Sequence, residues 1–117
     1  MTYTTPFTPA TLVAENDRYF GSAGRSAGNR GLGFRPAFMD SATGTVYPSC
    51  FRDGRPAPVH LLDGLPPHLV TRRAPDGRVC AVTGSIVSGF VRDWRFYTRE
   101  EAMQAGEDEQ AGTLAYA

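Results

Sequence analysis

The spacing of hydrophobic positions changes near residue 33 and divides the chain into two parts. The first part carries a thin apolar stripe made of Leu12, Val13, Tyr19 and Phe20. Thr8 followed by Pro9 is a typical helix start, and Gly21 is a typical helix stop. The pattern predicts a short helix over residues 9–20, with an extended segment at a sheet edge as the alternative.

From residue 33 onward, short runs of alternating apolar and polar residues are separated by turn formers. This pattern is typical of antiparallel strands. Runs 34–39 and 45–51 flank one turn segment, and runs 69–73 and 79–82 flank another. The pattern therefore predicts two hairpins.

Prolines and Asp-Gly pairs add expectations about where the strands lie in the sheet and where the chain turns. Because proline donates no hydrogen bond to a ladder, Pro36 and Pro48 are expected at a sheet edge or a bulge. Three Asp-Gly pairs begin at Asp53, Asp63 and Asp76. Their spacing lacks the alternating oxygen ligands of a calcium loop, so we expect three tight turns.

The stretch from residue 85 to residue 101 reads as strand, reversal, strand and helix start. A two-residue turn at Asp93-Trp94 gives three cross-strand pairs: Arg92 with Arg95, Val91 with Phe96, and Phe90 with Tyr97. Such a turn needs positive φ at both central residues, which Trp tolerates poorly. The sequence therefore indicates either a wider turn or an unfavourable tip that is kept for a reason.

The residues after this turn form a capping box. Thr98 and Glu101 have the spacing in which each side chain bonds the backbone N–H of the other. The expected helix covers residues 99–105 and ends at Gly106.

Together these elements predict a small single α+β domain. Its core is mainly an antiparallel β-sheet of about 4–6 short strands with one or two short helices, which is what 117 residues can hold. We divide the chain into an N-terminal arm (1–32), a β-rich core (33–106) and a loose C-terminal tail (107–117).

Charge and composition exclude several classes of function. The formal net charge is zero, and all 12 residues in the Lys+Arg count are Arg. Mechanisms that need a lysine are therefore excluded. We find no signal peptide and no apolar run long enough to span a membrane, so a cytoplasmic protein is expected.

The glycine-rich segment 21–33 has the composition of a phosphate-binding loop but not its order. It lacks a Gly-Lys-Ser/Thr ending, and its glycines do not match a dinucleotide fingerprint. We interpret it as a flexible linker.

Cysteine and histidine are the remaining candidates for chemistry. The chain has Cys50, Cys80, His60 and His68. They lack metal-ligand spacing, and a cysteine nucleophile with a histidine base is the alternative to buried, inert thiols. We expect no catalytic residue, no metal, no cofactor and no enzymatic activity.

Two groups of residues are candidates for contact with a partner. The hairpin tip offers Arg92, Trp94 and Arg95, residue types that are enriched in binding hot spots. An acidic face that would mimic phosphate consists of Glu100, Glu107, Asp108 and Glu109. The alternative is that Trp94 folds back over the sheet and the arginines are solvated.

Several motifs between Gly33 and Ala102 carry a family resemblance. They are residues 33–38 (GFRPAF), 53–58 (DGRPAP), 60–66 (HLLDGLP), 88–93 (SGFVRD) and 95–102 (RFYTREEA). With them the chain resembles small uncharacterised proteins of proteobacterial mobile elements, such as plasmids and prophages. It departs from that pattern at Trp94, where the family has glycine.

The resemblance implies a genomic setting, in which small proteins often act by covering a host protein's surface. We therefore expect a non-enzymatic protein-binding protein, plausibly an anti-CRISPR-type inhibitor that acts on a host protein or protein–nucleic-acid complex. The alternative is a nucleic-acid-binding accessory protein that uses Arg25, Arg30, Arg92, Arg95 and Tyr97.

Overall fold

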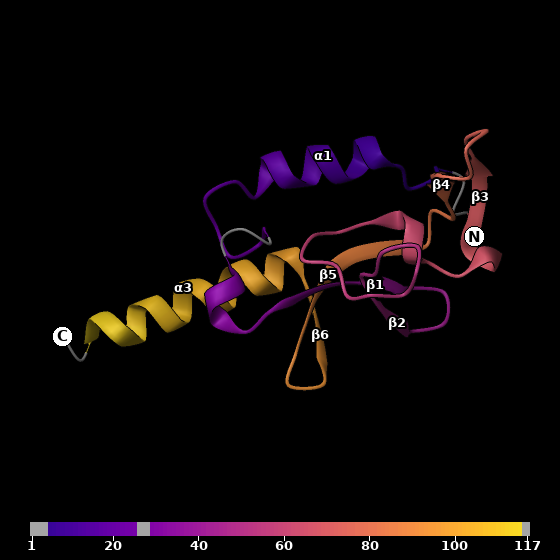
Figure 1. Ribbon diagram of the computed structural model, residues 1–117. Helices are drawn as coiled ribbons and strands as arrows, with labels where there is room; N and C mark the ends of the chain where they lie inside the picture. The colour runs from indigo at the N-terminus through magenta and orange to yellow at the C-terminus, as the bar shows by residue number, and fades with distance from the viewer. Residues whose placement is uncertain (1–4, 26–28, 116–117) are drawn as a thin grey trace.

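A computed structural model describes residues 5–25 and 29–115, with the backbone alone for residue 30 and residues 110–115 (Figure 1). In chain order the helices and strands are α1 (Pro9–Arg18), β1 (Arg35–Asp40), β2 (Thr45–Pro48), β3 (Val70–Arg73), β4 (Val79–Val82), β5 (Ile86–Arg92), β6 (Arg95–Thr98) and α3 (Arg99–Ala115). Short 3-10 turns lie at Arg30–Leu32, Leu62–Gly64 and Pro67–Leu69. The predicted α+β domain with a mainly antiparallel sheet is confirmed.

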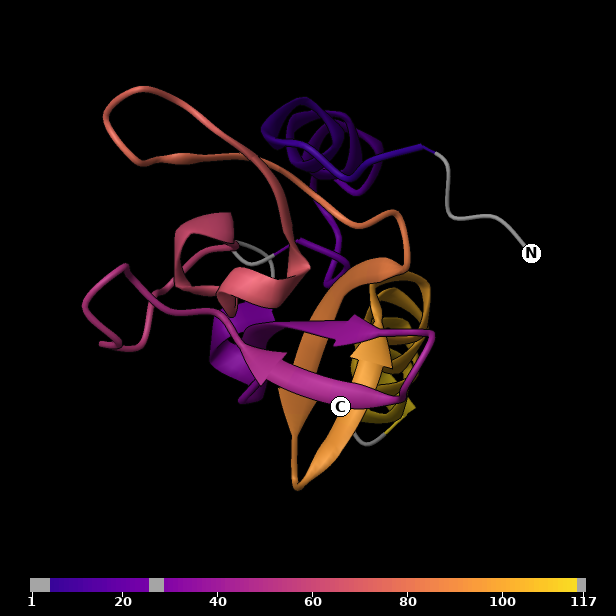
Figure 2. The same cartoon turned by 90° about the vertical axis from the view of Figure 1, so that its right-hand side faces the viewer.

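The main sheet has four strands in the order β2-β1-β5-β6, and all neighbours are antiparallel. Both predicted hairpins are present, since β1 pairs with β2 and β3 pairs with β4. The β3–β4 hairpin forms a separate two-stranded sheet that stands away from the main one (Figure 2). Strand β5 is central because it pairs with β1 on one side and with β6 on the other.

Pro36 corrects one expectation, because it lies on the inner strand β1 rather than at an edge. Its carbonyl oxygen accepts from the Ser49 N–H at 2.9 Å. The N and C=O of one strand residue point to the same side, so the missing Pro36 N–H would point past the end of β2. Pro36 therefore removes no hydrogen bond from the β1–β5 ladder.

One face of the main sheet is covered, and both apolar clusters of the core lie on it. Phe38 and Ile86 belong to the larger cluster, which includes Leu12 of α1. Phe90 belongs to the smaller cluster, which includes Ala102 of α3. By register these sheet residues share a face, so α1 and α3 cover the same side of the sheet.

Helix α1 begins as the sequence predicts. Thr8 is its N-cap and accepts from the Thr11 N–H, and Pro9 occupies the first helical position. The helical interpretation of residues 9–20 is therefore confirmed over Pro9–Arg18.

Helix α3 begins as predicted but is longer. The Thr98 N–H donates to Glu101 Oε1 at 2.9 Å, and the Glu101 N–H donates to Thr98 Oγ1 at 3.1 Å. The expected end at Gly106 is wrong, because the helix continues to Ala115 through residues 107–115, which were expected to be loose. Residues 116 and 117 of the predicted tail lie outside the described residues.

The glycine-rich segment is packed where the structure describes it. Ala23, Gly24 and Asn29 are buried, and a Cβ at Gly106 would lie 2.5 Å from that of Ala23. Gly106 therefore permits a close approach of this segment to α3 instead of ending the helix. The interpretation as a flexible linker is wrong for these residues, while residues 26–28 lie outside the described part.

Two of the three Asp-Gly pairs form the expected tight turns. Gly54 and Gly77 have φ of 92° and 89°. The third, Asp63-Gly64, lies in a 3-10 turn, where Gly64 allows the chain to approach the carbonyl oxygen of Cys50.

Candidate functional site

The β5–β6 hairpin ends in a strained turn that exposes Trp94. The register pairs Arg92 directly with Arg95, which makes Asp93-Trp94 the two-residue turn. Asp93 has φ of 53° and Trp94 has φ of 68°, so both adopt left-handed conformations. The Trp94 side chain is fully exposed, with 101% relative accessibility.

This turn is costly for the folded protein. A non-glycine residue in the left-handed region costs roughly 1–2 kcal/mol, and Asp pays less than Trp because its short side chain bonds locally. Full exposure means that the Trp94 indole gains no burial to offset this cost. The interpretation in which Trp94 folds back over the sheet is therefore wrong.

The two tip arginines contact other residues of the protein rather than the Trp94 indole. Arg92 packs against the ring of Phe34, with its guanidinium carbon 4.2 Å from the ring centroid. Its Nη1 donates to Glu109 of α3 at 2.9 Å, and hydrogen bonding to Glu109 raises the pKa of Arg92. Arg92 therefore lies on the covered side of the sheet.

Arg95 is also engaged toward α3. Its guanidinium lies 4.4 Å from the ring centroid of Tyr97, and its Nη2 is 3.3 Å from a carboxylate oxygen of Glu101. The tip therefore presents Trp94 with Asp93, while both arginines pair with glutamates of the following helix.

Three of the four residues of the predicted acidic face make separate contacts within the protein. Glu100 accepts a hydrogen bond from Tyr19 at 3.0 Å, and Asp108 accepts one from Gln104 at 3.2 Å. Glu109 pairs with Arg92, and Glu107 is exposed. These four acidic residues do not gather with Trp94 into one site.

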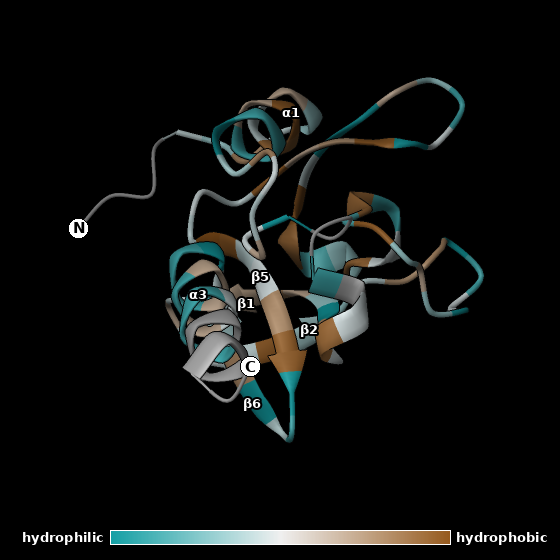
Figure 3. Cartoon of the chain, turned by 90° about the vertical axis from the view of Figure 1, so that its left-hand side faces the viewer, coloured by the Kyte–Doolittle hydropathy of each residue, from teal (hydrophilic) through white to brown (hydrophobic). Residues whose placement is uncertain are grey.

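A second feature borders the tip, namely the face of the sheet that carries neither helix. On this face, which also carries Arg35 and Thr98, five apolar residues form what we call the open face: Met39, Val46, Val87, Val91 and Phe96. None of these five side chains is buried, and Val46 is 37% exposed. In Figure 3 the hydrophobic strand β5 leads directly to the hydrophilic turn at the hairpin tip. Trp94 thus stands at one end of a partly exposed apolar surface.

A buried polar cluster lies between the two apolar clusters on the covered face. Arg99 is only 3% exposed and donates to Ser88 at 2.9 Å, to Asn16 at 3.1 Å and to the Gly24 carbonyl at 3.0 Å. Ser88 donates in turn to Glu15, whose carboxylate lies 3.4 Å from Arg99 Nε. Burial lowers the pKa of Arg99, and the Glu15 charge opposes that effect.

His60 completes this cluster as a neutral side chain. Its Nε2 lies 2.6 Å from the Gly89 carbonyl oxygen, which can only accept. Its Nδ1 lies 3.2 Å from Arg99 Nη2, which can only donate, so the Nε2–H tautomer is fixed. Burial and the Arg99 charge lower the pKa of His60 to about 4.

This cluster was not predicted from the sequence as a unit. His60 was a candidate ligand or base, and residue 99 was only the first residue of the expected helix. The cluster joins residues up to 83 positions apart, and no spacing in the sequence signals it. The one available hint was an arginine at the first position of a helix, where the helix dipole favours negative charge.

The candidate residues for catalysis do not form a reactive pair. Cys50 and Cys80 are free thiols that border different cavities, and His60 borders the cavity of Cys80. Both ring nitrogens of His60 are already hydrogen-bonded, so it has no position for a substrate or a thiol. Within the described ranges no three His, Cys, Asp or Glu side chains gather as a metal site.

Comparison with protein-family models, with curated proteins and with solved structures gave no match. Over residues 5–25 and 29–115, no helix has the length and apolar character needed to cross a membrane.

Proposed function

We propose that this protein is a non-enzymatic binding protein that docks on a partner protein through Trp94 and the open face. The observation that carries this proposal is the fully exposed Trp94 in a strained turn. A conformation that costs free energy and gains no internal contact is explained if a partner covers the indole. Trp is also among the residues most enriched in binding hot spots.

The open face supplies the rest of a docking surface. Its side chains are apolar and partly exposed, and Val91 and Phe96 lie next to the turn that holds Trp94. An aromatic anchor with adjoining apolar area is typical of the buried part of a stable interface. The non-enzymatic part of the proposal is supported by the engagement of both His60 nitrogens.

The partner we propose is a host protein or protein–nucleic-acid complex. The resemblance of the chain to proteins of mobile elements favours a defence complex, so the activity would be inhibition of the anti-CRISPR type. Trp94 would act by occupying a surface that the host complex needs for nucleic acid or for another subunit.

Direct binding of nucleic acid is less well supported. The guanidinium carbon of Arg25 lies 5.3 Å from the ring centroid of Phe20, while Arg92 and Arg95 pair with glutamates. The side chain of Arg30 lies outside the described part. We therefore expect the protein not to retain DNA or RNA even at low salt, where phosphate contacts are strongest.

Affinity capture from a host lysate tests the proposal with matched variants. Trp94→Ala removes the indole, and Val46→Glu places a charge on the open face. Phe20→Ala and Val59→Glu are the controls, because Phe20 is 75% exposed and Val59 is 45% exposed at other places.

We expect both test variants to lose a captured protein that the wild type and both controls retain. Thermal unfolding establishes that all four variants are folded. Retention of every captured protein by Trp94→Ala would overturn the proposal.

A further inference from the structure

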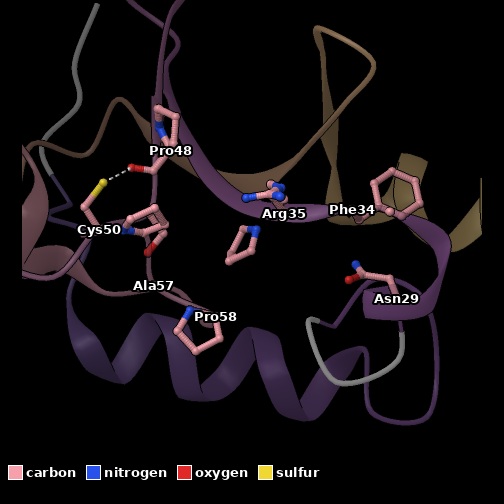
Figure 4. A pocket seen from close by; sticks show the side chains of 11 residues that line it. Asn29, Phe34, Arg35, Pro48, Cys50, Ala57 and Pro58 are labelled. Atoms are coloured by element: carbon pink, nitrogen blue, oxygen red, sulfur yellow. Dashed lines mark hydrogen bonds between the residues drawn. The ribbon is translucent and has the colours of Figure 1, made fainter. Parts of the chain in front are cut away.

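A cavity of about 630 Å³ lies where β1 begins and β2 ends (Figure 4). Apolar side chains form much of its lining, among them Phe34, Pro48 and Pro58. A cavity of this volume is large enough for a small organic molecule. Rigid proline rings and an aromatic ring favour a flat, apolar ligand.

One buried acceptor in this cavity has no partner among the described residues. Asn29 is 1% exposed, and its Nδ2 donates to the Ala23 carbonyl at 2.6 Å. That bond fixes the orientation of the amide, and Oδ1 has no hydrogen-bond partner among the described residues. Figure 4 shows the Asn29 amide directed into the space between Arg35 and Pro58. A buried acceptor without a donor costs free energy, which a ligand N–H would recover.

The charge of the cavity lining is positive. Arg35 is exposed and borders the cavity, and the described residues that line the cavity include no Asp or Glu. Its guanidinium is suited to a carboxylate, which it can bind with two parallel hydrogen bonds.

We propose that this cavity binds a small aromatic carboxylate that carries an N–H donor. The ring packs against Phe34 and the prolines, the N–H donates to Asn29 Oδ1, and the carboxylate pairs with Arg35. The site borders the open face, since Arg35 pairs with Val91, but different residues define the two sites, so either one can fail without the other.

The two cysteines provide a measurement with an internal control. Cys50 borders this cavity, and its thiol donates to the Pro48 carbonyl at 3.4 Å. Cys80 borders the other cavity. The rate at which N-ethylmaleimide modifies each thiol is followed by mass spectrometry, with indole-3-carboxylate as the probe.

We expect the probe at ten times its dissociation constant to slow modification of Cys50 about tenfold and to leave Cys80 unchanged. The matched probe 1-benzothiophene-3-carboxylate has the same shape without the N–H. It should bind about tenfold more weakly, because it leaves the Asn29 acceptor unpaired.

A substitution of Arg35 tests the role of the ligand's carboxylate. Arg35→Gln should weaken binding of indole-3-carboxylate but not of indole itself, whereas Arg72→Gln, at an exposed arginine beside the other cavity, should change neither. Equal affinity for the two carboxylates would overturn the role of Asn29. Equal protection of both cysteines, or no protection of Cys50, would overturn the site.

Discussion

Arg99 is the residue that ties the two helices to the central strand. From the first position of α3, its guanidinium reaches Asn16 of α1 and Ser88 of β5. The charge is buried but compensated by Glu15 and by four donated hydrogen bonds, including the one to His60. Breaking such a buried set is expensive because the remaining partners keep their desolvation cost without the bonds.

Replacing Arg99 should therefore destabilise the whole domain. We expect Arg99→Leu to lower the free energy of unfolding by about 3 kcal/mol, measured by urea denaturation. Arg95→Leu is the matched control, since its pair with Glu101 is exposed and worth less than about 1 kcal/mol. Equal effects of the two substitutions would contradict the assigned role of Arg99.

At the scale of single residues, the sequence could predict only local features. The capping box of Thr98 and Glu101 was predictable because both partners lie within one helical turn. The Arg99 cluster was not, since Glu15 and Ser88 are 73 positions apart and only the fold brings them together. The exposure of Trp94 was one of two predicted outcomes, and the sequence could not decide between them.

At the scale of elements, helix α3 shows how packing outweighs a local signal. Gly106 was read as a helix stop, but a glycine within a helix costs only about 1 kcal/mol. Its lack of a side chain permits the close approach of Ala23. The strands were more predictable than this helix, because their alternation and turn residues are local, as in the β3–β4 hairpin.

The packing of Gly106 against Ala23 predicts that a glycine-to-alanine substitution in this helix lowers the free energy of unfolding. Gly106→Ala would normally stabilise a helix, yet we expect it to lower the free energy of unfolding by about 1 kcal/mol, because the new methyl group overlaps Ala23. The double variant Ala23→Gly/Gly106→Ala should recover that loss. Thermal denaturation of the wild type and the two variants measures both effects, and a stabilising Gly106→Ala substitution would contradict the contact.

At the scale of the whole molecule, the neutral state of His60 predicts how stability depends on pH. The pKa of His60 is about 4 in the folded protein, against 6.5 for an ordinary histidine. Between these values the unfolded chain binds a proton that the folded chain does not, so acidification favours unfolding. The stability present above pH 6.5 should fall by up to about 3 kcal/mol as the pH approaches 4.

Denaturation at several pH values checks this expectation. Relative to the wild type, His60→Gln should flatten the pH dependence between 6.5 and 4, because the side chain no longer titrates. His68→Gln serves as the control, since His68 is exposed. A wild-type profile that matches that of His60→Gln would show that His60 does not stay neutral in the folded protein.

The exposed tip connects the fold to the proposed function, and one substitution tests it most directly. Trp94→Gly relieves the positive φ of this residue and removes the indole. We expect this variant to be more stable than the wild type by about 1 kcal/mol and to lose the partner protein captured by the wild type. Paired measurements of melting temperature and partner affinity would contradict the account if Trp94→Gly bound the partner as tightly as the wild type.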